Sequence, residues 1–90
     1  MLATKVKMKP GCGQSTRLED IQALYITGGI RAGYFHVNDL WDYLDYNPGY
    51  IQVNVRGYPN LVAVGQGERR HLKSTLSPKG VDYLFSLPRE

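Results

Sequence analysis

Hydrophobic and polar residues alternate along several short segments of this 90-residue chain, which is typical of strands. In Thr4–Lys9, three lysines are separated by Val6 and Met8, as in a strand with one exposed cationic face. The residues 10–13 (PGCG) then form a loop. We therefore expect one small domain over residues 1–90, with residues 1–14 contributing a peripheral strand and loop.

Residues 15–26 fit two structures. Thr16 and Glu19 have the spacing of a capping box, which would begin a helix. Ile21–Ile26 (IQALYI) is instead short and apolar and ends at two glycines, as a strand before a turn does. We favour the strand, with a second strand over Ile30–His36 after the turn.

The clearest helical pattern follows. The apolar residues at i, i+3, i+4 and i+7 form one stripe on a helix, and they are Val37, Leu40, Trp41 and Leu44. Asn38 suits the N-cap position. Three aspartates, Asp39, Asp42 and Asp45, lie on the opposite side and are expected to face solvent. The residues 47–49 (NPG) stop the pattern, so we predict a helix over residues 38–46.

The C-terminal half predicts a three-stranded antiparallel meander. Its strands are Tyr50–Val55, Leu61–Val64 and Glu68–Leu76, separated by turn-forming residues. Alternation assigns five residues to its buried side: Ile51, Val53, Val55, Leu72 and Leu76. A serine and a proline at 77–78 then begin a short C-terminal helical turn.

These elements predict an α+β fold. A small antiparallel sheet of four to five strands would be packed on one face by the helix at 38–46, and the other face would remain hydrated.

Composition and charge exclude few classes of function. The formal net charge is +3, and the excess is uneven: residues 1–49 carry five charges of each sign, whereas residues 50–90 carry six basic and three acidic groups. No apolar run is long enough for a transmembrane segment or a signal peptide. A single cysteine, Cys12, excludes an internal disulfide, so we expect a cytoplasmic protein without membrane contact.

The segment His71–Pro88 (HLKSTLSPKGVDYLFSLP) resembles the C-terminal signature of a small bacterial domain-of-unknown-function family, the one numbered 3892. The matching positions are Leu72, Lys73, Ser74 or Thr75, Asp82, Leu84, Leu87 and Pro88. Many members have an asparagine where this chain has Tyr83. The resemblance implies a similar order of elements over residues 20–88 and implies no activity, because the family has none established.

Motifs for catalysis or metal binding are weak. The two histidines, His36 and His71, and Cys12 are far apart in sequence and include no closely spaced ligand pair, so we expect neither a metal site nor a cofactor. A small enzyme is the third hypothesis, with His71, Lys73 and Thr75 on one strand face.

Two binding hypotheses rank above it. The leading one is a non-catalytic interaction module that binds a protein partner or a second copy of itself, because tyrosine is enriched at protein contacts. Tyr43, Tyr46 and Tyr58 are the candidate contact residues. The alternative is weak nucleic-acid binding through a basic, tyrosine-containing sheet face. Seven residues would form that face: Tyr50, Gln52, Asn54, Arg56, Arg69, His71 and Lys73.

Overall fold

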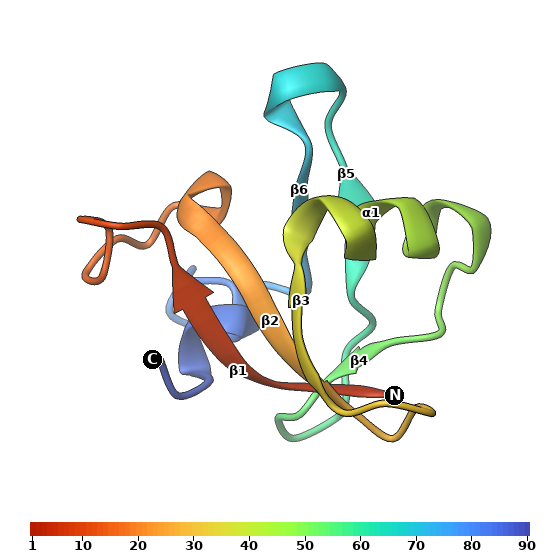
Figure 1. Ribbon diagram of the computed structural model, residues 1–90. Coiled ribbons are helices and arrows are strands. Elements are labelled where there is room, and N and C mark those ends of the chain that lie inside the picture. Colours follow the sequence, from red (N-terminus) through yellow and green to blue (C-terminus); the bar gives the residue numbers. More distant parts are fainter.

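The computed structural model describes residues 1–90 and contains one α-helix, a mixed four-stranded sheet and a separate two-stranded hairpin (Figure 1). The predicted α+β class is confirmed. In the larger sheet the strands have the order β3-β2-β1-β4, and their bounds are Leu2–Met8 (β1), Ile21–Thr27 (β2), Gly33–His36 (β3) and Gln52–Val53 (β4). The helix and the hairpin strands are Val37–Tyr46 (α1), Val62–Val64 (β5) and His71–Lys73 (β6). Three short 3₁₀ helices complete the fold: Leu18–Asp20 (η1), Gly67–Arg69 (η2) and Tyr83–Ser86 (η3).

Strand β1 is internal to the sheet rather than peripheral. It pairs antiparallel with β2 on one edge and parallel with β4 on the other. The predicted alternation is present, since Lys5 and Lys7 are exposed whereas Val6 and Met8 are buried. The expectation of a peripheral strand was wrong because strand order depends on pairing between distant segments, which the alternation within one strand does not specify.

The strand prediction for residues 21–26 is confirmed by β2. The helical alternative survives only as the single 3₁₀ turn η1, whose N-cap residue Arg17 makes no side-chain capping bond. Ser15 ties this turn together instead: its hydroxyl accepts from the Arg17 amide and donates to the Asp20 carboxylate, at 3.0 and 2.7 Å.

Helix α1 confirms the predicted helix and its apolar stripe. Val37, Leu40 and Leu44 are buried, and Trp41 is partly buried against the same core. The N-cap is His36 rather than Asn38, and the His36 Nδ1 atom accepts from the Asn38 amide at 3.2 Å. The predicted cap residue lies inside the helix because β3 runs straight into α1 with no loop between them.

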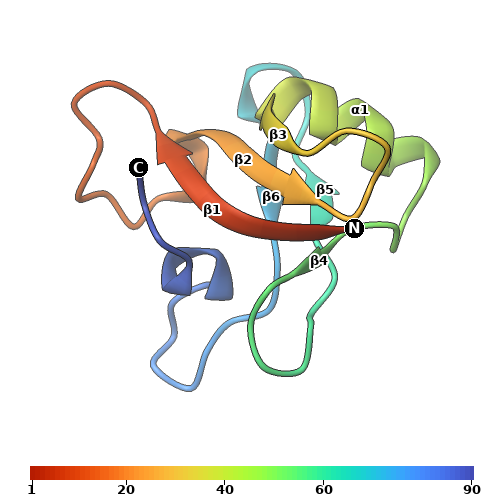
Figure 2. The same cartoon turned by 60° about the horizontal axis from the view of Figure 1, so that its bottom comes forward.

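The predicted meander is divided between the two sheets. Residues 51–53 do pair with residues 59–61, through Val53 N to Pro59 O and Leu61 N to Ile51 O, both 2.8 Å. Beyond that point β5 pairs with β6 in a sheet of its own, while β4 lies parallel to β1 (Figure 2). A regular antiparallel meander is therefore not formed, because the segment 59–64 pairs with the β4 region only up to Leu61 and with β6 from Val62 onward.

The third predicted strand is much shorter than Glu68–Leu76. Leu72 is buried as expected, but Leu76 is 64% exposed, so its assignment to the inner side was wrong. The chain leaves the strand direction after β6 because the Ser74 amide and hydroxyl both bind the Asp82 carboxylate. The predicted C-terminal helical turn is present as η3, with Asp82 rather than Ser77 as its N-cap.

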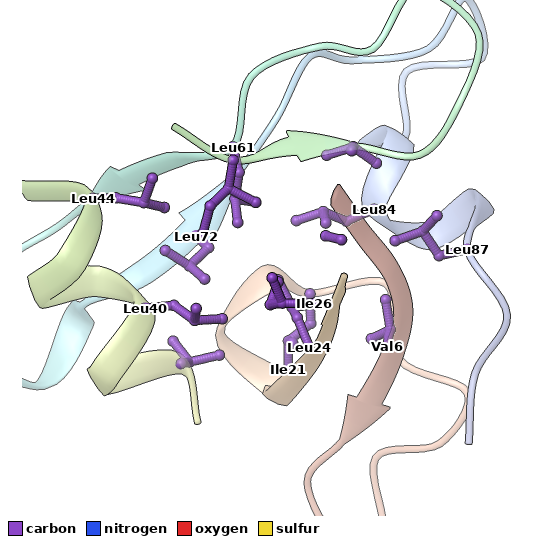
Figure 3. Packing of buried hydrophobic residues seen from close by; sticks show 14 of the residues in the cluster. Val6, Ile21, Leu24, Ile26, Leu40, Leu44, Leu61, Leu72, Leu84 and Leu87 are labelled. Atoms are coloured by element: carbon purple, nitrogen blue, oxygen red, sulfur yellow. The ribbon is translucent and has the colours of Figure 1, made fainter. Parts of the chain in front are cut away.

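One hydrophobic core takes side chains from α1, from all six strands or the residues next to them, and from η1 and η3 (Figure 3). Leu40 from α1 faces Leu24 and Ile26 from β2, and Leu44 lies beside Leu61 and Leu72. The C-terminal segment closes the core beside Val6 with two buried leucines, Leu84 and Leu87. None of the helices has the length and hydropathy that would allow it to cross a membrane.

Candidate protein-binding surface

An apolar pocket of about 500 Å³ lies between the β2–β3 turn and α1. Seven of its ten lining residues are hydrophobic, which is the usual character of a binding cavity. The lining residues are Met1, Ile26, Gly29, Ile30, Arg31, Phe35, Asp39, Leu40, Tyr43 and Ile51. They belong to β2, to β3, to the turn between these strands and to α1, together with Met1 just before β1 and Ile51 just before β4.

The turn between β2 and β3 gives the pocket its rim. Gly28 adopts a φ of +85°, a left-handed conformation that glycine accepts without strain. A Cβ atom on Gly28 would lie 3.4 Å from the Met1 Cα, and one on Gly29 would lie 2.9 Å from the Met1 Sδ. The absence of side chains at both positions therefore lets the turn pack against the start of β1 and leaves Ile30 at its tip.

Ile30 is the most exposed large hydrophobic residue of the chain, with its side chain fully accessible to solvent. It stands on the rim of the pocket, next to Arg31. Arg31 has no carboxylate within 4.0 Å, and Asp39 on the α1 side of the pocket has no cationic partner within that distance. The rim thus presents an exposed aliphatic side chain and two unpaired charges of opposite sign.

Only one of the three predicted contact tyrosines lines this pocket. Tyr43 lines it, and the Tyr43 ring meets the exposed Tyr50 ring edge to face, with centroids 6.3 Å apart. Tyr46 is exposed on the same helix but does not line the pocket, and Tyr58 is exposed in the loop after β4. We call Ile30, the pocket lining, Tyr43 and Tyr50 the apolar patch.

The seven residues predicted to form a nucleic-acid face come from separate sheets. Tyr50, Gln52 and Asn54 flank or belong to β4, whereas His71 and Lys73 belong to β6. Arg56 is exposed in the loop after β4, and Arg69 is exposed in η2. The Gln52 amide is engaged locally, donating to the Asn60 side chain at 3.2 Å. The assumption of a shared surface depended on the regular meander, which is not formed.

A different basic sheet face is present, and the sequence reasoning missed it. Strand pairing aligns Lys5 with Tyr25 and Tyr25 with Tyr34 across β1, β2 and β3. The Lys5 ammonium lies 5.1 Å from the Tyr25 ring centroid, and the two tyrosine rings meet edge to face at 5.1 Å. The lysine alternation in β1 was a visible signal, but the register that places it beside two tyrosines was not.

Tyr34 has an unusual environment on this face. Its hydroxyl oxygen is buried and has no hydrogen-bond partner. Burial raises the pKa of Tyr34 above its usual value of 10.0, and the negative charge of Glu90 acts in the same direction.

The His71 strand offers little for the enzyme hypothesis. The Nδ1 atom of His71 donates to the Arg69 carbonyl oxygen at 2.7 Å, and its Nε2 atom lies 4.0 Å from the Glu19 carboxylate. The neighbouring Ser74 hydroxyl donates to the Asp82 carboxylate rather than to His71. No group of three or more histidine, cysteine, aspartate or glutamate residues is placed so that it could hold a metal ion.

Comparison with known proteins adds no family to this description. No protein-family model, curated protein or solved structure matches the chain. The resemblance of residues 71–88 to the bacterial family therefore stays a prediction, and the functional argument depends on the geometry alone.

Proposed function

We propose that this protein is a non-catalytic interaction module and that the apolar patch is its protein-binding surface. The observation that carries the proposal is the pocket beside α1, which is apolar on most of its wall and open at a rim that carries an exposed isoleucine. Contiguous exposed apolar surface on a small domain is typical of sites that bind other proteins.

The chemistry of the patch fits this use. Tyr43 and Tyr50 provide large, rigid contact area with hydroxyl groups that remain compatible with water in the unbound state. The charged lining residues, Arg31 and Asp39, are both exposed to solvent, as charged groups in the polar rim of a protein interface are. We further propose a cytoplasmic location, in keeping with the single cysteine.

Selection of peptides from a displayed library on the immobilised protein tests the proposal. Selected peptides should lose binding to the Tyr43→Ala variant, which changes the pocket wall. They should keep binding to the matched Tyr46→Ala variant, because Tyr46 lies on the same helix outside the pocket. Equal binding to both variants, or failure to select any peptide on the monomeric chain, would contradict the proposal.

Nucleic-acid binding is the second candidate function, and the row of Lys5, Tyr25 and Tyr34 supports it better than the residues first considered. Aromatic rings beside cations on an open sheet are suited to stacking with bases and to phosphate contact. Retention on single-stranded DNA that falls steeply with salt and is lost in Lys5→Ala would favour this function.

A further inference from the structure

The apolar patch contains both a protruding group and a cavity that would accept one. Ile30 is fully exposed at the tip of the β2–β3 turn, although removal of an isoleucine side chain from water is favourable. The pocket beside it is lined mostly by aliphatic and aromatic side chains and is larger than one isoleucine side chain. A pocket for an unrelated partner would require only the cavity, so the exposed isoleucine needs a separate explanation.

The charged side chains at the rim also include both members of a complementary pair. Arg31 and Asp39 both line the pocket, and neither has an ion-pair partner within 4.0 Å in its own chain. Asp42, on the same helix, is already paired with Arg70 at 3.3 Å. One patch therefore supplies a free cation and a free anion in addition to a protruding apolar group and a cavity.

A two-fold symmetric dimer requires a surface that contains both partners of each contact. Residue i of one copy contacts residue j of the other, and residue j of the first copy contacts residue i of the second. We propose that the partner bound by the apolar patch is a second copy of this chain, with Ile30 of each copy inserted in the pocket of the other and Arg31 facing Asp39 across the interface. This inference rests on the proposed function and names its partner.

A dimer of this kind would cover a small part of the surface of each chain. A standard interface buries about 800 Å² from each partner, which would be about one-seventh of the 5832 Å² accessible surface of this chain. Beyond Ile30 and the pocket, Tyr43 and Tyr50 extend the same patch. Tyrosines around a central aliphatic anchor are the usual composition of an interface core.

Sedimentation equilibrium of the full chain over a range of concentrations tests the dimer. The wild-type protein should show a monomer–dimer equilibrium, and Ile30→Asp should weaken it by about 30-fold or more, as expected for a central anchor residue. Val62→Asp is the matched control, because Val62 is also an exposed β-branched residue but does not line the pocket. Equal weakening by both variants, or a wild-type protein that is monomeric throughout, would overturn the inference.

A charge exchange tests the two-fold arrangement itself. Arg31→Glu alone places two carboxylates against each other at both contacts, and Asp39→Arg alone brings two cations together, so each variant should dimerise about 10-fold more weakly than wild type. A mixture of the two variants restores an opposite-charge pair at both contacts of the heterodimer, because the two substituted residues face each other at one contact and the native Arg31 and Asp39 at the other. The mixture should therefore associate more tightly than either variant alone, and failure to do so would overturn the Arg31–Asp39 pairing.

The double variant Arg31→Glu with Asp39→Arg completes this test, because it restores an opposite-charge pair at both contacts with the signs exchanged. It should recover most of the wild-type association. A double variant that dimerises as weakly as the single variants would show that Arg31 and Asp39 do not face each other.

The experiments distinguish a wrong dimer from a wrong interaction surface. If the wild-type chain is monomeric but selected peptides still bind in a Tyr43-dependent manner, the dimer is wrong and the interaction surface stands. If peptides also bind without regard to Tyr43, both fail. If the dimer forms and Ile30→Asp dissociates it, the peptides should compete with dimerisation, because both occupy the same pocket.

Discussion

The four-stranded sheet with α1 and the C-terminal segment from β5 onward share one core but are stabilised differently. β1 and β2 pair at six residue positions, and their inner side chains are almost completely buried. β5 and β6 pair at only three positions, and the segment depends on individual polar contacts. The Trp41 indole donates to the Val64 carbonyl oxygen at 2.9 Å, and the buried Asp82 carboxylate accepts from the amides of Ser74 and Leu84.

The contrast shows two ways in which a small domain can keep its structure. In the sheet, stability is distributed over buried apolar area, so polar substitutions on its outer face should have small effects. In the C-terminal segment, single groups determine the path of the chain, so the loss of one backbone conformation or one carboxylate should be costly.

The largest effect is expected from Leu24→Ala in the sheet. Leu24 is completely buried at the centre of the core, and its truncation should lower the free energy of unfolding by about 3–4 kcal/mol. Denaturation by urea measures the loss. Leu76→Ala is the control from the C-terminal segment, and a comparable loss there would contradict the exposed position of Leu76.

Gly65→Ala should be almost as damaging, although it adds only one methyl group. Gly65 has a φ of +84°, and a Cβ atom there would overlap the backbone carbonyl of Arg69. We expect a loss of about 2–3 kcal/mol in unfolding free energy. Gly80 has a similar φ of +81° but open space around it, so Gly80→Ala should cost about 1 kcal/mol. Equal losses would mean that the left-handed conformation alone determines the effect.

Asp82→Ala tests the polar anchor of the C-terminal segment. Removal of the carboxylate leaves the Ser74 hydroxyl and two buried or partly buried amides without an acceptor, which should cost about 2 kcal/mol. Thermal unfolding measures the loss. Asp82→Asn keeps one carbonyl oxygen and should lose less. Asp45→Ala, on the exposed side of α1, should have little effect, and a large effect there would undermine the comparison.

Trp41→Phe examines the link between the two regions. The variant loses the hydrogen bond to Val64 and weakens the contact with the Arg70 guanidinium, which lies 4.2 Å from the ring centroid. We expect a loss of about 1 kcal/mol, with faster amide exchange in β5 and β6 than in β1. Arg70→Met retains the hydrogen bond and should lose less. Uniform acceleration of exchange would show that the two regions open as one unit.

Tyr34→Phe should have the smallest effect and a favourable one. It removes a buried hydroxyl that has no partner, so stability at neutral pH should rise by up to about 1 kcal/mol.

The same variant also has a pH signature. Because the Tyr34 pKa is raised in the folded state, the folded chain holds this proton more tightly than the unfolded chain does above pH 10.0. The wild-type stability contributed by this group is complete below that pH and falls as the pH rises further. Tyr34→Phe should remove this part of the alkaline decline, and urea denaturation of wild type and variant on both sides of pH 10.0 measures the difference.

Prediction from the sequence succeeded where local patterns determine structure. The 3.6-residue period of Val37, Leu40 and Leu44 predicted α1 and its buried face, and the alternation around Val6 predicted β1. The two glycines at 28–29 predicted the turn between β2 and β3. That turn also contained an unused signal for the candidate site, because an isoleucine directly after two glycines, like Ile30, is poorly placed to reach a core.

Strand pairing could not be predicted from local sequence patterns. Two short segments with period-2 alternation can pair with any strand of matching length, and the choice is made by the burial of both faces at once. The parallel pairing of β1 with β4, the bend of the meander and the exposure of Leu76 all follow from that choice. The predicted nucleic-acid face assumed that β4 and β6 share a sheet, whereas the structure places them in separate sheets.

The sequence by itself determined the α+β class, the position of the helix and the burial of most apolar residues, because these depend on periodicities within a few neighbouring positions. Only the tertiary structure decided which strands are neighbours and which side chains from distant segments meet. The pocket between Met1, Ile30 and Tyr43 is such a meeting, formed when the glycine turn packs on the start of β1 next to α1. Its binding role is therefore a property of the folded chain, for which no contiguous motif exists.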